Sequence, residues 1–366
     1  MKKILLGVLA LLVALAAYLA FWPVPVEPVA WNAPPSPGYQ GAHAANTRLA
    51  GLQRITLPQG ESGPEHVVFG RDGKLYAAVA SGRILRMNPD GSAPEVYADT
   101  GGRVLGFDFD ADGRLIAADA VKGLLAIGTD RRVTVLADKV DGDPIRYADA
   151  VVVAKNGKIY LSDASGRFAP AQWGGTFEAA VLDIIEQRAT GRILEYDPAT
   201  QKTRVVVRGL SFPNGVALSP DEQHLYVAET GRYRIWKVAV DAANLDAGSG
   251  AAQAQVLFDN LPGYPDNLMR GAEGRIWVGL SGPRSPQVDE MAGKPFLRAL
   301  TLRLPRALWP LPVPYGHVFA FDDSGRIVAD LQDPAGSYPE TTGVTETADR
   351  LYIQNLHLGV LGWKPK

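Results

Sequence analysis

Residues 210–238 read LSFPNGVALSPDEQHLYVAETGRYRIWKV. After a polar hinge with a tight Pro213-Asn214-Gly215 turn, apolar and polar residues alternate between turn signals. This pattern predicts three short strands, at residues 216–218, 224–228 and 234–238. Consecutive strands joined by tight turns form a β-meander, so we ask whether the same unit recurs along the chain.

The turn and the strand that follows it recur six times. The six copies begin at Asp72, Asp112, Asn156, Glu222, Glu273 and Ala348. Most copies are followed by a third strand, as at residues 82–85, and then by a fourth, edge-like strand, as at residues 95–97. Four antiparallel strands repeated six times predict an all-β fold, the six-bladed β-propeller. A sandwich or an irregular β-protein would leave the repeat unexplained.

The composition sets limits on the class of protein. With 366 residues, 46% hydrophobic and 21% charged, the chain is typical of a folded protein with a large core. Lys+Arg 37 and Asp+Glu 39 nearly balance, without a long run of one sign, so we expect no nucleic-acid partner. The absence of cysteine excludes disulfides, zinc–thiolate sites, iron–sulfur clusters and a cysteine nucleophile.

Residues 1–22 are predicted to be a membrane anchor or a signal peptide. Lys2 and Lys3 precede an apolar run over residues 4–22. At about 1.5 Å per residue, this run just crosses a hydrocarbon core of about 30 Å. It continues past the small residues 14–17, which favours an uncleaved anchor over cleavage there. The two lysines predict a cytoplasmic N-terminus, and therefore an exported domain.

A proline-rich linker over residues 23–50 separates this segment from the propeller, which we place at residues 51–366. Its prolines include Pro23, Pro25, Pro28, Pro34, Pro35 and Pro37. Chains rich in proline are stiff and extended, so the linker is predicted to be a spacer that lifts the propeller off the membrane.

Two insertions with helical periodicity interrupt the repeat. In residues 176–188, Thr176 is a candidate N-cap, and one face of the helix would carry Phe177, Val181, Ile184 and Ile185. We expect a lid or wall over one propeller mouth. Residues 288–309 predict a helix that Pro305 kinks or ends. This second insertion could touch the membrane, although packing on the propeller flank is favoured.

Aligning the repeats on their turn glycine defines one position about eight residues earlier, at the start of each innermost strand. In chain order it holds Glu65, Leu105, Asp149, Asn214, Asp266 and Thr341. Innermost strands line the central channel, so three carboxylates and an amide should converge there. They would repel one another unless a cation held them. Ca²⁺, which takes 6–8 oxygen ligands, fits best, and Mg²⁺ is second. Each residue taken alone also has a local explanation, in a turn or at a strand start.

The five histidines give no indication of zinc, because they form neither an i,i+4 pair nor an HExxH motif. His66 and His357 could approach the channel, but we expect buried structural roles for both. The sequence has no convincing nucleophile elbow, P-loop or dinucleotide-binding motif.

Four segments carry a family resemblance. They are residues 160–165, 188–198, 212–219 and 265–267. Together they resemble the strictosidine-synthase-like branch of the SMP-30/gluconolactonase superfamily, and in particular its membrane-anchored, adipocyte-plasma-membrane-associated-protein-like members. The resemblance implies a six-bladed propeller with calcium in the channel, held by Glu65, Asp149, Asn214 and Asp266. Asp149 replaces the asparagine that is usual in its slot, which adds negative charge and could supply a base.

The resemblance also implies a range of activities. Calcium-dependent lactonases and arylesterases belong to the superfamily, so we expect a hydrolase of small ester or lactone substrates, with Asp266 as nucleophile or general base. Leu105 replaces the histidine of paraoxonase-type lactonases, and Thr341 replaces the glutamate of strictosidine synthase, which argues against both variants. A non-enzymatic, calcium-stabilised binding propeller is the alternative, and a strictosidine-synthase-like carbon–nitrogen lyase or condensing enzyme is third.

Overall fold

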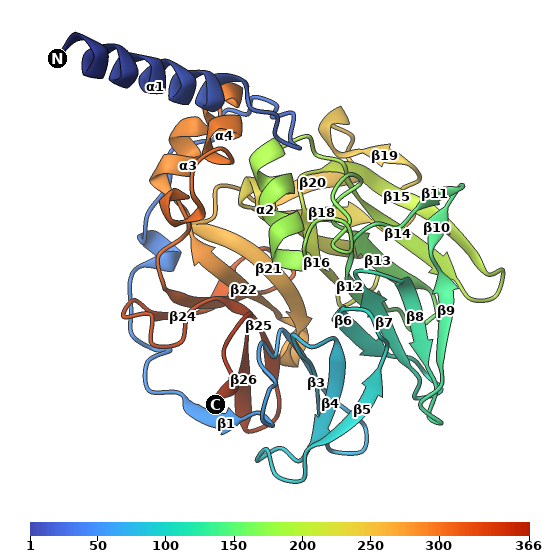
Figure 1. Cartoon of the computed structure of the whole chain (residues 1–366). Helices are drawn as coiled ribbons and strands as arrows, with labels where there is room; N and C mark the ends of the chain where they lie inside the picture. Colours follow the sequence, from blue (N-terminus) through green and yellow to red (C-terminus); the bar gives the residue numbers. More distant parts are fainter.

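Six sheets, each built on four antiparallel strands and one extended by a fifth, surround a central axis in the computed structural model, which describes residues 1–366 (Figure 1). The predicted six-bladed β-propeller is confirmed. Blade 1 comprises β2 (His66–Phe69), β3 (Leu75–Ala78), β4 (Arg83–Met87) and β5 (Glu95–Asp99). Blade 2 comprises β6 (Val104–Phe109), β7 (Leu115–Asp119), β8 (Gly123–Ile127) and β9 (Val133–Ala137). Blade 3 comprises β12 (Ala148–Val153), β13 (Ile159–Asp163), β14 (Gly191–Asp197) and β15 (Lys202–Leu210), with β19 (Leu245–Asp246) added in parallel.

The remaining blades follow the same order. Blade 4 comprises β16 (Pro213–Leu218), β17 (His224–Glu229), β18 (Arg234–Ala239) and β20 (Ala254–Phe258). Blade 5 comprises β21 (Gly263–Arg270), β22 (Ile276–Pro283), β23 (Gly316–Phe321) and β24 (Ile327–Asp333). Blade 6 comprises β25 (Thr341–Glu346), β26 (Arg350–Asn355), β27 (Val360–Pro365) and β1 (Gln53–Thr56). A small ribbon of β10 (Lys139–Val140) and β11 (Asp143–Pro144) lies outside the blades.

Blade 6 closes the ring with strands from both ends of the chain. β1 pairs antiparallel with β27, from Gln53 opposite Trp363 to Thr56 opposite Val360. The core lies between adjacent blades, where apolar side chains of one sheet pack on those of the next. For example, Val152 of blade 3 shares a buried cluster with Val216 and Leu225 of blade 4. Closure therefore leaves each blade with two neighbours and no free face.

The six aligned positions at the starts of the innermost strands are called slots here. Glycines next to two of these slots let the innermost strands approach closely. A Cβ on Gly215 would lie 2.3 Å from the backbone nitrogen of Leu268 and 2.4 Å from the carbonyl oxygen of Asp266. A Cβ on Gly106 would lie 2.9 Å from the carbonyl oxygen of Asp149. The predicted tight turn at residues 213–215 was wrong, because these residues begin strand β16. Gly215 is needed for contact between blades 4 and 5.

Helix α1 (Lys2–Phe21) projects from the propeller above two short helices, α3 (Pro286–Met291) and α4 (Pro295–Thr301) (Figure 1). It has no buried residue, is exposed up to Tyr18, and is long and apolar enough to cross a membrane. An apolar helix without a protein partner is typical of a membrane span or signal anchor.

Residues 23–50, which we call the strap, lie along the propeller. The backbone nitrogen of Val29 donates to Glu186 O (2.8 Å), and that of Trp31 donates to Ala292 O (3.0 Å). Leu49 is fully buried, and its backbone nitrogen donates to Gln332 O (3.0 Å). The prediction of a spacer that lifts the propeller off the membrane was therefore wrong. Proline content predicts an extended chain, but apolar residues between the prolines give that chain a surface to bind.

The first insertion forms helix α2 (Thr176–Glu186), as predicted. Its N-cap is Gly175 instead of Thr176, and no side chain caps it. The second insertion is not one helix ending at Pro305. It consists of α3 (Pro286–Met291), α4 (Pro295–Thr301) and the short 3₁₀ helix η5 (Arg306–Leu308). Pro295 starts a new helix because proline is favoured at the first helical position.

The second insertion lies at the propeller mouth, and the favoured prediction that it packs on the flank was wrong. Several of its residues line the same cavity as α2. Its Arg303 side chain also donates to Trp22 O (2.7 Å) and Leu19 O (3.2 Å), at the base of α1. The two insertions thus wall the mouth, and the second joins it to the helix that could enter a membrane.

Candidate functional site at the propeller mouth

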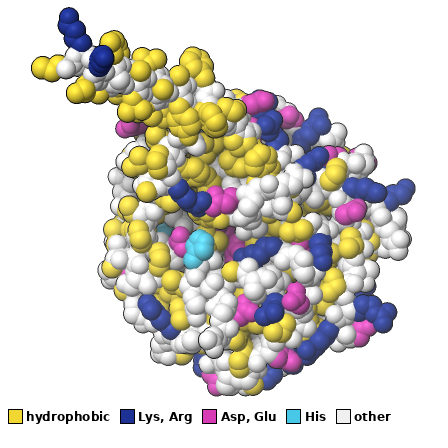
Figure 2. All heavy atoms as spheres, viewed as in Figure 1, with side chains coloured by type: hydrophobic (Ala, Val, Ile, Leu, Met, Phe, Trp, Pro, Cys, Tyr) yellow, Lys and Arg dark blue, Asp and Glu magenta, His cyan; other side chains and the backbone are white.

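One large cavity, of about 590 Å³, opens at the end of the propeller that carries both insertions. Three of its polar residues lie near the starts of innermost strands: Asp149 on β12, Asn214 on β16 and Asp266 on β21. Its apolar wall comes from α2 and from residues 309–314. Figure 2 shows hydrophobic side chains of α1 continuing onto a hydrophobic area of the propeller at the helix base.

All four predicted metal ligands line this cavity. Glu65, Asp149, Asn214 and Asp266 are each less than 9% exposed. The register of the repeat therefore identified side chains that converge in space. Their predicted roles in catalysis and metal binding remain proposals.

The other two slot positions have structural surroundings. Leu105 packs in a buried apolar cluster with Tyr147 and Phe212. The hydroxyl of Thr341 accepts the backbone N–H of His317 (3.0 Å) and lies 2.8 Å from its carbonyl oxygen. The sixth slot therefore offers no acid or base to the cavity.

Burial and mutual repulsion dominate the electrostatics of the cavity. Burial raises the pKa of Asp149 well above its usual range, and the charges of Glu65 and Asp266 raise it further. Burial also raises the pKa of Asp266 well above its usual range, again with a contribution from Glu65. Arg103 acts in the opposite direction on Glu65 and Asp149. A cation bound among these groups would stabilise their ionised forms.

Two side-chain oxygens in the cavity are free to accept a ligand. Asn214 Oδ1 and Asp266 Oδ1 are buried and have no hydrogen-bond partner. A buried polar atom without a partner costs about 1–3 kcal/mol, so such atoms usually indicate an unseen ligand or a functional site. Together with the carboxylates of Glu65 and Asp149, they form an all-oxygen donor set. This set suits a hard cation such as Ca²⁺.

Arg103 is a cavity residue that the repeat alignment missed. Its guanidinium forms a partly buried ion pair with Glu65 and also donates to Val104 O (3.2 Å). It lies two residues before the Leu105 slot, and residues two apart on a strand share a face. This spacing from the Leu105 slot could have indicated that Arg103 faces the cavity. The guanidinium pairs with one of the four predicted ligands, Glu65, and its positive charge also acts on Asp149.

His357 and Glu340 form a second polar pair at the mouth. Nδ1 of His357 lies 2.7 Å from Oε2 of Glu340, and both residues line the cavity. This hydrogen bond raises the pKa of His357 above its usual value, against the effect of burial. The buried role expected for His357 was wrong, since its side chain is 53% exposed. The same expectation is confirmed for His66, where burial lowers the pKa to about 4.

Comparison with known proteins identifies the family. The family descriptions "Strictosidine synthase-like, N-terminal" and "Strictosidine synthase" match residues 41–87 and 149–243. The protein strictosidine synthase-like 6 of Arabidopsis thaliana is 33% identical over 300 residues, covering 80% of this chain and 76% of that protein. The chain belongs to the strictosidine synthase-like family. The resemblance predicted from four short motifs is confirmed.

Other relatives of this strictosidine synthase-like protein include the adipocyte plasma membrane-associated protein of Rattus norvegicus. It is 29% identical over 334 residues, covering 85% of each chain. Among solved structures, a gluconolactonase from Xanthomonas campestris has a TM-score of 0.61 and 21% identity, covering 93% of this chain and 98% of that one. The calcium-binding protein regucalcin from Agrobacterium tumefaciens has a TM-score of 0.55 and 16% identity, covering 85% and 93%. At these identities the structures establish a shared propeller fold.

Proposed function

We propose that this strictosidine synthase-like propeller is a membrane-anchored, calcium-dependent hydrolase of ester or lactone substrates. The observation that carries the proposal is the set of buried oxygens in the cavity, two of which have no partner. Glu65, Asp149, Asn214 and Asp266 would hold the ion. The names of the two neighbours, a gluconolactonase and a calcium-binding protein, support the same chemistry.

The chain's own residues would handle the proton. When bound, Ca²⁺ supplies a Lewis acid for the carbonyl oxygen of the substrate. In the simplest route Asp266 acts as general base and accepts a proton from the water that attacks the carbonyl carbon. The carbon–oxygen bond of the ester then breaks, and Asp266 returns the proton to the leaving alkoxide. Asp266 is buried, and a bound cation would keep its carboxyl group in the ionised form that a general base requires. Asp149 is the second candidate base, and direct attack by Asp266 is the alternative route.

The cavity walls favour apolar substrates. Side chains of α2, including Phe177, Val181 and Ile185, face the cavity together with Trp309 and Leu311. A pocket with apolar walls and a few convergent polar groups is typical of small-molecule sites. A substrate with an aryl or alkyl group would bury that group against these walls and present its carbonyl oxygen to the ion that the four residues would hold.

The position of the mouth supports action close to a membrane. Exposed apolar side chains surround it and continue towards α1, among them Phe296, Leu308, Leu311 and Val313. Such side chains are typical of surfaces that contact lipid. We therefore propose that the propeller is exported and held with its mouth near the bilayer through α1. The membrane-associated relative supports anchoring.

One observation favours a second function, a calcium-stabilised binding module without catalysis. Arg103 already neutralises Glu65, so the cavity is partly balanced without an ion. In that case the mouth would hold a ligand or a protein partner, and calcium would be structural.

Hydrolysis assays on the full chain in detergent test the proposal. A panel of aryl esters and lactones is assayed with Ca²⁺, with EDTA, and with EDTA followed by excess Ca²⁺. We expect turnover that chelation abolishes and calcium restores. Asp266→Asn should lower kcat by at least about 100-fold, the usual effect of losing a general base. The exposed acid Asp349 provides the control, and Asp349→Asn should leave kcat unchanged. Calcium binding without any turnover would support the binding module instead.

A further inference from the structure

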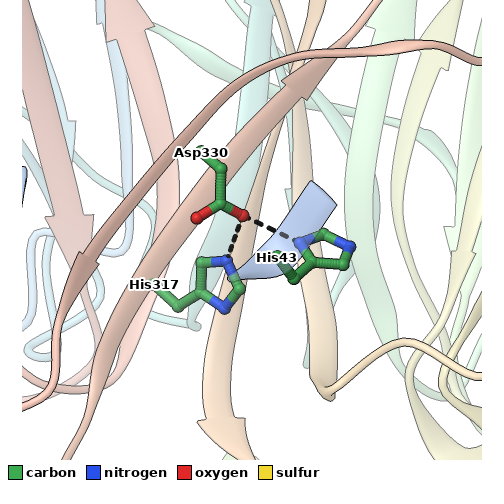
Figure 3. Close-up of side chains that lie close together, drawn as sticks. All are labelled: His43, His317 and Asp330. Carbon is green, nitrogen blue, oxygen red and sulfur yellow. Dashed lines mark hydrogen bonds and ion pairs between the residues drawn. The ribbon is translucent and has the colours of Figure 1, made fainter. Parts of the chain in front are cut away.

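Three potential metal ligands meet outside the cavity, where the strap crosses blade 5. His43 lies on the 3₁₀ helix η1 (Gly41–His43), His317 on β23 and Asp330 on β24 (Figure 3). Nδ1 of His43 and Nε2 of His317 each lie 2.8 Å from the same oxygen, Oδ2 of Asp330. All three ligand atoms lie within 4.8 Å of one another. The two imidazoles and the carboxylate therefore point to one place.

Neighbouring amides fix the orientation of the carboxylate. The other oxygen of Asp330, Oδ1, accepts hydrogen bonds from Asn46 Nδ2 (2.9 Å) and Gln332 Nε2 (2.6 Å). Gln332 is held in turn by the hydroxyl of Tyr315 (2.7 Å). Hydrogen bonds of this kind, which orient a carboxylate from behind, are typical of metal-ligating carboxylates.

The surroundings of the cluster leave a negative charge to be balanced. His317 and Asp330 are buried, and the aromatic rings of Tyr39 and Phe319 lie beside His317. The Asp330 carboxylate therefore lies between two imidazoles in a largely apolar shell, where a cation would stabilise its charge.

We propose that His43, His317 and Asp330 bind a zinc ion that fastens the strap to blade 5. Two imidazoles and one carboxylate suit Zn²⁺, whereas Ca²⁺ prefers oxygen ligands alone. Zinc–ligand distances of about 2.0–2.2 Å in a tetrahedron separate the ligand atoms by about 3.4 Å. Each of the present 2.8 Å separations would have to widen by about 0.6 Å. Rotation of the partly exposed His43 ring would widen the first, and a small rotation of the Asp330 carboxylate would widen the second. A water would complete the site.

The tautomer of His317 can change when the ion binds. Its Nδ1 has no hydrogen-bond partner, so no other contact fixes which ring nitrogen carries the proton. A shift of the proton to Nδ1 leaves the Nε2 lone pair available to the metal. No sequence motif could show this site, because 287 residues separate His43 from Asp330.

Metal analysis of the full, untagged chain in detergent tests the proposal. The protein is stripped with EDTA, dialysed, titrated with Zn²⁺ against a fluorescent zinc chelator and analysed by inductively coupled plasma mass spectrometry. We expect one zinc per chain, a rise in Tm and an X-ray absorption spectrum with two imidazole ligands. His43→Ala should weaken zinc affinity by at least about 100-fold. His224→Ala, which changes a half-buried histidine on β17, should not, and neither should Asp266→Asn in the cavity.

Two results would overturn the zinc site. A wild-type protein that retains less than about 0.1 zinc per chain, with no change in Tm, would show that the three residues form a hydrogen-bonded network only. Equal zinc binding by the wild type and by His43→Ala would show that the metal lies elsewhere. The absorption spectrum of the wild type decides the ligands even if a variant fails to fold. Neither result depends on hydrolysis, so this proposal stands or falls apart from the proposed function.

Discussion

Substitution of Gly215 by alanine should weaken calcium binding without changing any predicted ligand. A Cβ at this position would lie 2.3 Å from Leu268 N and 2.4 Å from Asp266 O. An ordinary contact needs at least 3.4 Å, so β16 and β21 would have to separate by about 1 Å. Both close atoms are backbone atoms, so no side-chain rotation can relieve the contact. The substitution should therefore shift Asn214, the preceding residue, relative to Asp266.

The size of this shift determines the expected effect. Calcium–oxygen distances in proteins span only about 2.3–2.6 Å, so a 1 Å shift removes a ligand from the ion's reach. We expect calcium affinity to fall by at least about 10-fold, or about 1.4 kcal/mol, measured by isothermal titration calorimetry. The free energy of unfolding should also fall, by about 1–3 kcal/mol, as for other overpacked cores.

A matched glycine controls for the loss of backbone freedom. The nearest atom to a Cβ on Gly359 would be 3.7 Å away, which is an ordinary contact. Gly359→Ala should leave calcium affinity unchanged. Wild-type affinity in a folded Gly215→Ala protein would refute the idea that contact between blades 4 and 5 sets the spacing of Asn214 and Asp266.

Further substitutions test the charges and the strap. Arg103→Gln should raise calcium affinity by about 10-fold, because it frees Glu65 and removes a nearby positive charge. Weaker binding in the calcium titration would contradict the idea that Arg103 competes with calcium for Glu65. Burial raises the pKa of Asp183 to about 7 in the folded protein, from 3.8. The folded state therefore binds this proton more tightly than the unfolded state does. The contribution of Asp183 to the free energy of unfolding should thus fall as the pH rises from 3.8 to about 7. Asp183→Asn should remove this contribution, on the order of 1.4 kcal/mol per pH unit, from urea unfolding curves measured across that range. Leu49→Ala should lower the free energy of unfolding in urea by about 2–5 kcal/mol, because Leu49 is buried. The same change at the exposed Leu308 should lower it by less than about 0.5 kcal/mol. Equal effects would argue against a strap that stabilises the propeller.

The blades and the four cavity oxygens could be predicted because both are encoded in a local, repeated pattern. A turn followed by an apolar strand is determined by neighbouring residues, and six copies of this unit predict six blades. The register then places Glu65, Asp149, Asn214 and Asp266 at one end of the channel, because equivalent residues of a propeller occupy equivalent positions. The convergence follows from symmetry and requires no knowledge of distant contacts.

Features that break the repeat could not be predicted in this way. The pairing of Arg103 with Glu65 and of His357 with Glu340 joins residues from different segments, and no period relates them. The course of the strap depends on which propeller surface its apolar residues bind, and proline spacing does not specify that surface. The choice of Gly175 as the N-cap of α2 depends on local backbone geometry, since Thr176 was the better candidate by composition.

The closing strand β1 has a mechanical consequence, because it is the first propeller strand after the strap. A tensile load applied to α1 reaches the strap contacts at Val29 and Trp31 before it reaches the four-residue ladder between β1 and β27. These hydrogen bonds can break one after the other under load while β1 stays paired with β27 and the ring stays closed. Cleavage of the chain within residues 14–17 would leave both the strap and the ring intact. The strap contacts and the closing ladder therefore do not depend on the segment that precedes them.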